Sequence, residues 1–279
     1  MRVGTHRLLI FLFLACAISL PAWGKTYRHP MGIAFDYPDD WNVRESAFTL
    51  LELVPPNPAS NERGPTESYF LMAFGIHASQ ATDPRLVEQV EALIKQVAPF
   101  LIPRGDTETL KHPAKAAMMR WAGNSPTGVP ARSDVYVLPG PNVSYALIAI
   151  GEEAQIQSRQ EAIRSIFAGF HFVAALKNLE LVAAWQNSAD QTYMHLRKDG
   201  TFHATQVGAS PQTTQSQKSD ESQTAAGKWF AEDGKLYLLA DNTTPLTFRY
   251  ELKGTPGART LTLRDASGQE QSLSESKSP

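Results

Sequence analysis

The chain has 279 residues, of which 42% are hydrophobic and 19% are charged, a composition typical of a folded globular protein and not of a disordered one. The formal net charge of −2 does not indicate a protein that binds nucleic acid or an anionic membrane surface. The length suits one large domain or two modest ones, each with its own hydrophobic core.

Residues 1–24 have the three parts of a secretory signal peptide. A basic start precedes an apolar run over residues 8–20, and Ala22 and Gly24 are the small residues expected before a cleavage site. The run is shorter than the roughly 20 residues of a membrane-spanning helix. We predict cleavage between Gly24 and Lys25 and export, most simply to a bacterial periplasm, with an uncleaved anchor as the alternative.

Cys16, the only cysteine, lies inside this leader. Phe13 and Leu14 precede it and the apolar run continues after it, which disfavours a lipid-anchored cysteine. The mature chain is therefore expected to have no disulfide, thiolate nucleophile or cysteine metal ligand. Loss of Arg2 and Arg7 with the leader takes the net charge from −2 to −4.

Alternating apolar residues predict strands at the start of a first domain, residues 25–172. Ile33, Phe35 and Tyr37 lie on one face of a strand that Pro38 ends. Further strands are predicted at residues 47–54, 68–78, 115–123, 133–140, 143–151 and 170–172.

Two helices are predicted between these strands. In the first, Asp83 is the N-cap and Pro84 the first helical residue. Its apolar stripe is Leu86, Val87, Val90, Leu93, Ile94 and Val97. The second starts at Ser158, where Glu161 completes a capping box, and ends at Gly169. Its buried side is Ala162, Ile163, Ile166 and Phe167. This order of elements predicts an α+β domain, in which helices pack on an antiparallel sheet.

A short motif near the start of this domain suggests a family. Together with the two helices and the closing residues 169–172, it resembles the PsbP-like fold, which photosystem extrinsic proteins, Ran-binding Mog proteins and bacterial DcrB-like envelope proteins share. The motif residues are Gly32, Phe35, Tyr37, Pro38 and Trp41. Gly169 departs from the Ser that relatives often carry. The resemblance implies docking onto other proteins and no shared catalytic residues, so we interpret the motif as core architecture.

A linker, residues 173–180, leads to an all-β second domain, residues 181–273, and a tail expected to be disordered, residues 274–279. The first hairpin keeps its apolar residues on one face only if Arg197 pairs with Thr201. That register leaves a three-residue loop that ends in a left-handed glycine. The polar segment 208–227 is interpreted as a mobile insertion, with a binding lid as the alternative.

The second hairpin has a two-residue turn, Asp233-Gly234. This turn pairs Trp229 with Leu238 on one face and Phe230 with Tyr237 on the other. Residues 246–252 and 259–265 extend the meander before a last short strand.

The second domain resembles a small lipocalin-like β-barrel. The matching residues are Leu181, Trp185, Leu196, Asp199, Gly200, Phe202, Gly227, Trp229, Leu236 and Leu238, and Ala183 stands where the pattern often has Gly. Such a barrel is either filled by its own side chains or holds one small ligand. We favour a filled interior, and Trp185, Phe202, Trp229 and Leu238 are the residues that would contact an apolar ligand.

No motif for catalysis or for a cofactor is found in the sequence. His29 with Met31, and Met194 with His195, combine ligands that suit copper. Residues 194 and 195 point to opposite faces of a strand, however, so core methionines and surface histidines are the preferred interpretation. His171 has no second His at ligand spacing. No metal or other cofactor is predicted.

Three functions are compatible with these features. The leading hypothesis is an exported, non-enzymatic binding or adaptor protein of the bacterial envelope that docks onto a protein partner. The second is a carrier of a small apolar ligand in the barrel or at the domain junction. A hydrolase comes third, and would need a buried carboxylate or a Ser-His pair in a cleft.

Overall fold

Strands that are apolar on both faces build the centre of the first domain. β11 (Pro130–Leu138) and β12 (Ser144–Glu152) are buried along most of their length and pair antiparallel. The large sheet has the order β3 (Asn42–Glu45), β4 (Leu51–Val54), β7 (Glu67–Phe74), β12, β11, β10 (Ala117–Asn124) and β8 (Ile102–Pro103), and β9 (Glu108–Thr109) also pairs with β10. The predicted antiparallel sheet is confirmed.

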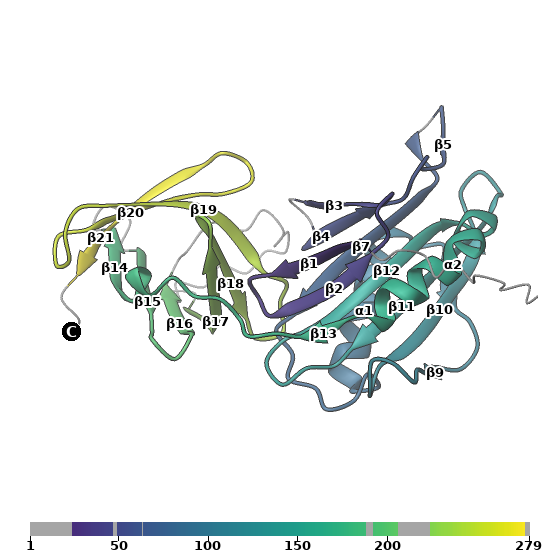
Figure 1. Cartoon of the computed structure of the whole chain (residues 1–279), viewed down its shortest axis with the longest axis horizontal. Helices are drawn as coiled ribbons and strands as arrows, with labels where there is room; N and C mark the ends of the chain where they lie inside the picture. Colours follow the sequence, from purple (N-terminus) through teal and green to yellow (C-terminus); the bar gives the residue numbers. More distant parts are fainter. Residues whose placement is uncertain (1–23, 47–48, 63, 188–191, 206–223, 277–279) are drawn as a thin grey trace, which may run out of the picture.

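The computed structural model describes residues 24–46, 49–62, 64–187, 192–205 and 224–276. These residues form a sheet-and-helix domain and a barrel that lie side by side (Figure 1). The predicted signal peptide lies outside the described residues, apart from Gly24. No helix in the described part of the chain is long and apolar enough to cross a membrane.

Helices cover the large sheet on both faces. α1 (Pro84–Val97) packs on one face. The other face is covered by α2 (Glu153–Ala168) and by a small sheet of β1 (Lys25–His29), β2 (Ile33–Tyr37) and β13 (His171–Phe172). A two-stranded pair, β5 (Ser60–Asn61) and β6 (Gly64–Pro65), projects from the domain (Figure 1).

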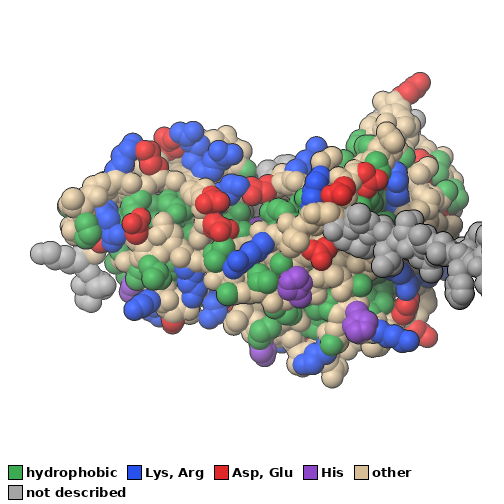
Figure 2. Space-filling view, in the orientation of Figure 1, with side chains coloured by type: hydrophobic (Ala, Val, Ile, Leu, Met, Phe, Trp, Pro, Cys, Tyr) green, Lys and Arg blue, Asp and Glu red, His purple; other side chains and the backbone are tan. Residues whose placement is uncertain are grey.

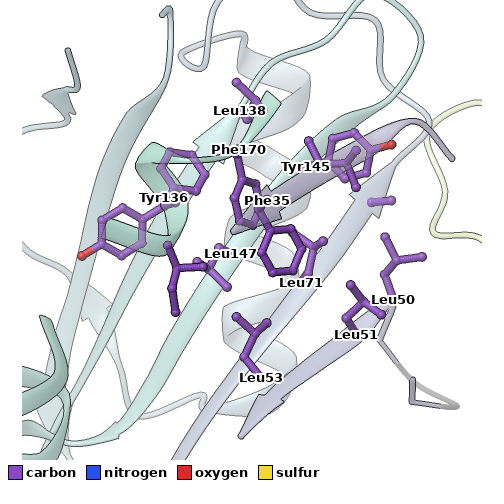
Figure 3. Packing of buried hydrophobic residues seen from close by; sticks show 14 of the residues in the cluster. Phe35, Leu50, Leu51, Leu53, Leu71, Tyr136, Leu138, Tyr145, Leu147 and Phe170 are labelled. Carbon is purple, nitrogen blue, oxygen red and sulfur yellow. The ribbon is translucent and has the colours of Figure 1, made fainter. Parts of the chain in front are cut away.

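The core beneath α2 is centred on aromatic rings. Phe35 and Phe170 stack with ring centroids 4.5 Å apart, and Tyr136, Leu147 and Leu71 surround them on the sheet (Figure 3). Phe35 is fully buried, which agrees with the interpretation of its motif as core architecture.

The predicted first helix is confirmed, but the predicted start of the second helix is wrong. Asp83 caps α1 by accepting a hydrogen bond from the backbone N–H of Arg85 at 3.0 Å, but Val97, placed in the apolar stripe, is 49% exposed. α2 begins at Glu153, directly after β12. Ser158 therefore lies inside the helix, where its hydroxyl donates to the carbonyl of Gln155 at 2.7 Å instead of capping.

The sequence did not predict that the strands of the first domain form separate sheets. The strands expected at residues 33–37 and 170–172 pair with each other, and β2 also pairs with β1, away from the large sheet. Of the strand expected at residues 47–54, only β4 forms, and residues 47–48 lie outside the described part of the chain. The short strands β1, β3, β5, β6, β8 and β9 were missed, because two to five residues give no clear periodicity.

The second domain is a closed antiparallel barrel of eight strands, so a small all-β barrel is confirmed. Its strands are β14 (Ala183–Asn187), β15 (Thr192–Leu196), β16 (Thr201–Thr205), β17 (Thr224–Glu232), β18 (Lys235–Ala240), β19 (Leu246–Lys253), β20 (Thr260–Arg264) and β21 (Glu270–Ser276), preceded by a 3₁₀ turn, η1 (Leu179–Leu181).

Both predicted hairpin registers are confirmed. The N–H of Arg197 donates to the carbonyl of Thr201 at 2.9 Å, and Gly200 has a φ of +86°. Trp229 pairs with Leu238, as expected for the Asp233-Gly234 turn.

The ends of two barrel strands differ from the prediction. β21 continues to Ser276 and closes the barrel on β14, so the disordered tail does not begin at residue 274. Residues 277–279 lie outside the described part of the chain. β17 begins at Thr224, so residues 224–227 of the expected mobile segment belong to a strand, and residues 208–223 lie outside the described part of the chain.

Candidate functional site at the domain junction

Residues 229–231 and 236–239 of the β17–β18 hairpin are buried on both faces and belong to both domains. Along it, Trp229, Ala231, Leu236 and Leu238 point into the barrel core. The alternate residues Phe230, Tyr237 and Leu239 are 5%, 2% and 1% exposed and pack into the core of the first domain. The outer face of an antiparallel sheet ordinarily meets water. Here it joins two hydrophobic cores.

Backbone hydrogen bonds hold the same junction. The N–H of Gly75, after β7, donates to the carbonyl of Thr243 at 3.0 Å, and the N–H of Asn242 donates to the carbonyl of Gly75 at 3.1 Å. A Cβ at Gly75 would lie 2.1 Å from the carbonyl oxygen of Ala240, so the approach requires glycine.

The linker is also tied to both domains. The N–H of Leu176 donates to the carbonyl of Pro30 at 2.8 Å, and the carbonyl of Leu176 accepts from Ala231 at 3.0 Å. Arg28 also donates to the carbonyl of Ala174 at 3.0 Å. The two domains therefore meet along a continuous seam.

A group of titratable side chains lies in this seam, and we name it the junction cluster: Tyr27, His29, Glu45, Glu232, Lys235 and Tyr237. The rings of His29 and Tyr237 meet edge to face, with centroids 4.8 Å apart. The Lys235 ammonium lies 2.5 Å from the Glu45 carboxylate and links β18 to β3. In the space-filling view, charged side chains line both rims of a notch between the two domains (Figure 2).

His29 is fully buried at the centre of the junction cluster. Its Nδ1 accepts a hydrogen bond from the N–H of Met31 at 3.2 Å, so the ring proton sits on Nε2. Nε2 is buried and has no hydrogen-bond partner among the described residues. Burial, and then the nearby charge of Lys235, lower the pKa of His29 to about 3.

The tyrosines of the cluster are held in their neutral form. Burial, followed by the charges of Glu45 and Glu232, raises the pKa of Tyr27 to about 12, and burial also raises the pKa of Tyr237. The pKa of His29 is lowered and the pKa values of the two tyrosines are raised, so all three pKa values lie far from neutral pH. His29 and the two tyrosines therefore keep fixed protonation states near pH 7, which suits a structural joint and not acid–base catalysis.

The four predicted ligand-contacting residues meet in the barrel core. Trp185 and Trp229 are fully buried, and Phe202 and Leu238 are 4% and 2% exposed. Both indole N–H groups already have partners: Trp185 donates to Leu181 at 2.9 Å and Trp229 to Arg197 at 2.8 Å, in each case to the carbonyl. This packing favours the filled interior, and ligand contact by these residues remains a prediction.

The buried carboxylates of the first domain are fully engaged. Asp134, 1% exposed, receives charge-assisted hydrogen bonds from Arg120 at 3.0 Å and from Arg132 at 2.6 and 2.8 Å. Glu67 accepts from the Tyr69 hydroxyl at 2.6 Å and from the N–H of Ala59 at 2.8 Å. Both carboxylates therefore serve structural contacts within the first domain.

The copper ligands considered from the sequence are not brought together. Met194 lies in the barrel core and His195 points outward, as predicted. His29, expected on the surface, is instead buried, because Tyr237 of the barrel covers it. His171 is exposed on β13. No group of three or more His, Cys, Asp or Glu side chains within the described ranges is placed to hold a metal ion.

The sequence prediction missed that Phe230, Tyr237 and Leu239 form an interface. A signal was present, since the predicted register placed Phe230 and Tyr237 opposite each other on the outer face of a barrel. Two large aromatic residues on an outward face indicate a covered surface.

No protein-family model matches the chain, and no curated protein does. Among solved structures, the chain is similar to a protein of Bacteroides thetaiotaomicron, with 14% identity and a TM-score of 0.35; the match covers 55% of this chain and 49% of that one, so the chain spans about half of that protein.

Two further solved structures are similar at a comparable level. LpqN of Mycobacterium tuberculosis, described as involved in cell envelope biogenesis, is 18% identical with a TM-score of 0.35, and the match covers 51% of this chain and 83% of LpqN. The cyanobacterial PsbP protein CyanoP of Synechocystis is 11% identical with a TM-score of 0.36. The match covers 53% of this chain and 91% of CyanoP. A PsbP protein is thus among the structural neighbours of this chain. These low similarities assign no activity and no site residue.

Proposed function

We propose that this chain is an exported, non-enzymatic binding or adaptor protein of the bacterial cell envelope, which docks onto another protein as one rigid two-domain body. The observation that carries the proposal is the β17–β18 hairpin, whose residues 229–231 and 236–239 are buried on both faces and join the two domains. A preorganised surface loses less conformational entropy on binding than two domains that move independently.

Two other features support docking over catalysis or transport. The carboxylates of Asp134 and Glu67 are engaged in hydrogen bonds, and the junction cluster holds its histidine and tyrosines far from their titration points. The barrel interior is packed with its own tryptophans, which leaves the outer surface as the means of recognition.

The edge of the first domain near the end of α1 is the surface we propose for docking. Val97 and Ile102 are 49% and 51% exposed and stand on either side of the turn that follows α1. Exposed apolar side chains of this kind are typical of the central part of a protein interface. β8, which carries Ile102, has two residues and ends in Pro103, so contact through side chains is favoured over addition of a strand.

Site-specific photo-crosslinking in the periplasm tests this proposal. A photoreactive residue at position 97 or 102 is expected to give one discrete adduct with a partner polypeptide. The same residue at exposed Glu88, on the α1 surface, serves as the matched control and is expected to give none. Native mass spectrometry of the protein from the same compartment gives the opposing result: a small molecule lost on denaturation, without any adduct, would replace the adaptor by the carrier.

A further inference from the structure

Two histidines face each other on the outside of the barrel. β15 and β16 pair antiparallel with His195 directly opposite His203. Met194 and Leu196, the neighbours of His195 along the strand, are buried in the barrel core, so His195 points outward, and His203 alternates in the same way. Directly opposed residues have Cβ atoms about 4.5–5.5 Å apart, close enough for two imidazoles to reach one ion.

Small residues flank this pair on both sides. Ala184 on β14 is opposite His195, and Ala226 on β17 is opposite His203. Neither imidazole has a hydrogen-bonded partner within the part of the chain that the structure describes, so their nitrogen lone pairs are available. Both side chains are partly exposed, which gives an ion a path from solvent.

Charges around the pair are balanced. A hollow beside His203 is lined by two cationic residues, Arg197 and Lys228, and by two acidic residues, Asp199 and Asp241. A cation bound to the histidines therefore meets no net repulsion from these four side chains.

We infer that His195 and His203 form a two-ligand site for a divalent transition-metal ion, with water molecules completing its coordination. Imidazole ligands suit Cu²⁺, Ni²⁺ and Zn²⁺, and the general order of affinities places Cu²⁺ as the tightest of the three. Both ligands come from paired strands of a closed barrel, so the site is preorganised. The inference does not depend on the proposed docking function.

The test is titration of the untagged mature chain with Cu²⁺ at pH 7.5, followed by calorimetry and by electron paramagnetic resonance. One Cu²⁺ per chain is expected in the tightest step, with a spectrum of two equatorial nitrogen ligands. His195→Gln and His203→Gln are each expected to weaken this step about tenfold or more, because one of the two protein ligands is lost. His171→Gln is the matched control, since His171 is exposed and lies opposite Ala34, and it is expected to change nothing.

Three results would overturn the inference. One is a tightest step whose affinity stays within about twofold in both single variants. Another is binding of two Cu²⁺ ions per wild-type chain that falls to one ion in each single variant without loss of affinity. That result would indicate that each imidazole binds its own ion. The third is an equal loss in His171→Gln. Far-UV circular dichroism confirms that each variant retains the barrel, because both histidines lie outside its core.

Discussion

The two domains bury different chemistry. Six of the seven buried polar or charged residues among those described lie in the first domain, including His29, Glu67, Arg132 and Asp134, and only Thr192 lies in the barrel. The barrel core consists of apolar side chains and two tryptophans whose N–H groups bond to nearby carbonyls. The barrel is therefore a filled support, while the first domain depends on a few specific polar contacts.

The junction cluster lies where these two kinds of interior meet. Tyr237 of the barrel covers His29 of the first domain, and the covering ring leaves the imidazole with an unpaired nitrogen. A buried polar atom without a partner reduces stability unless the surrounding contacts offset its cost. Apolar packing of the hairpin supplies those contacts, so this comparison predicts that the domains unfold together.

The largest effect is expected from loss of the barrel core. Trp229→Ala removes a fully buried side chain and should lower the free energy of unfolding by about 3–5 kcal/mol. Because the hairpin also belongs to the core of the first domain, calorimetry should show one transition that shifts as a whole. Leu246→Ala, at a residue 42% exposed, is the control and should change little. If Trp229→Ala left the unfolding temperature of the first domain unchanged, that result would contradict a core shared by the two domains.

Loss of the junction contact should separate the two domains. Tyr237→Ala removes the ring that covers His29 and should cost about 3 kcal/mol, with one thermal transition splitting into two. Tyr193→Ala changes a tyrosine on β15, outside the junction, and is expected to keep the single transition. A single unsplit transition in Tyr237→Ala would indicate that the backbone bonds at Gly75 are sufficient to couple the domains.

His29 should make stability depend on pH. Its pKa is lowered to about 3 in the folded state from 6.5, so the unfolded chain binds the additional proton between these values. Stability is therefore complete above pH 6.5 and is lost as the pH falls toward 3, by at most about 1.4 kcal/mol per pH unit from this group. Urea unfolding from pH 7 to 4 measures the slope, and His29→Gln should reduce it. An unchanged slope would remove His29 as its cause.

The smallest effect is expected at the closure of the barrel. Glu275 on β21 accepts hydrogen bonds from Arg259 at 2.5 and 2.8 Å and from the N–H of Gly257 at 2.7 Å. The Arg259 side chain is the main cause that lowers the pKa of Glu275 to about 2 from 4.5, so its contribution is present above pH 4.5 and is lost as the pH falls through about 2.

Glu275→Gln should cost about 1 kcal/mol at pH 7, measured by urea unfolding. Glu251→Gln, at an exposed position on β19, is the control. An equal cost in both variants would show that closure of the barrel does not use the Arg259 contact.

Local signals predicted the elements that depend on near neighbours in the chain. The Asp83-Pro84 start of α1 and both hairpin registers were correct, because caps and tight turns act over two to five residues. The hairpin register also contained the His195–His203 pair, since pairing Arg197 with Thr201 places these two residues opposite each other. It was missed because metal ligands were sought along the chain and not across the strands.

The sequence by itself determined the α+β and barrel classes, the alternation that fills the barrel, and the turns that set its register. The tertiary structure alone decided that His29 is buried, that β13 pairs with β2, and that the outer face of the β17–β18 hairpin is an interface. Alternation along a strand shows which residues share a face, but it does not show what covers that face. The covering surface comes from residues some 200 positions away, such as Tyr237 on His29.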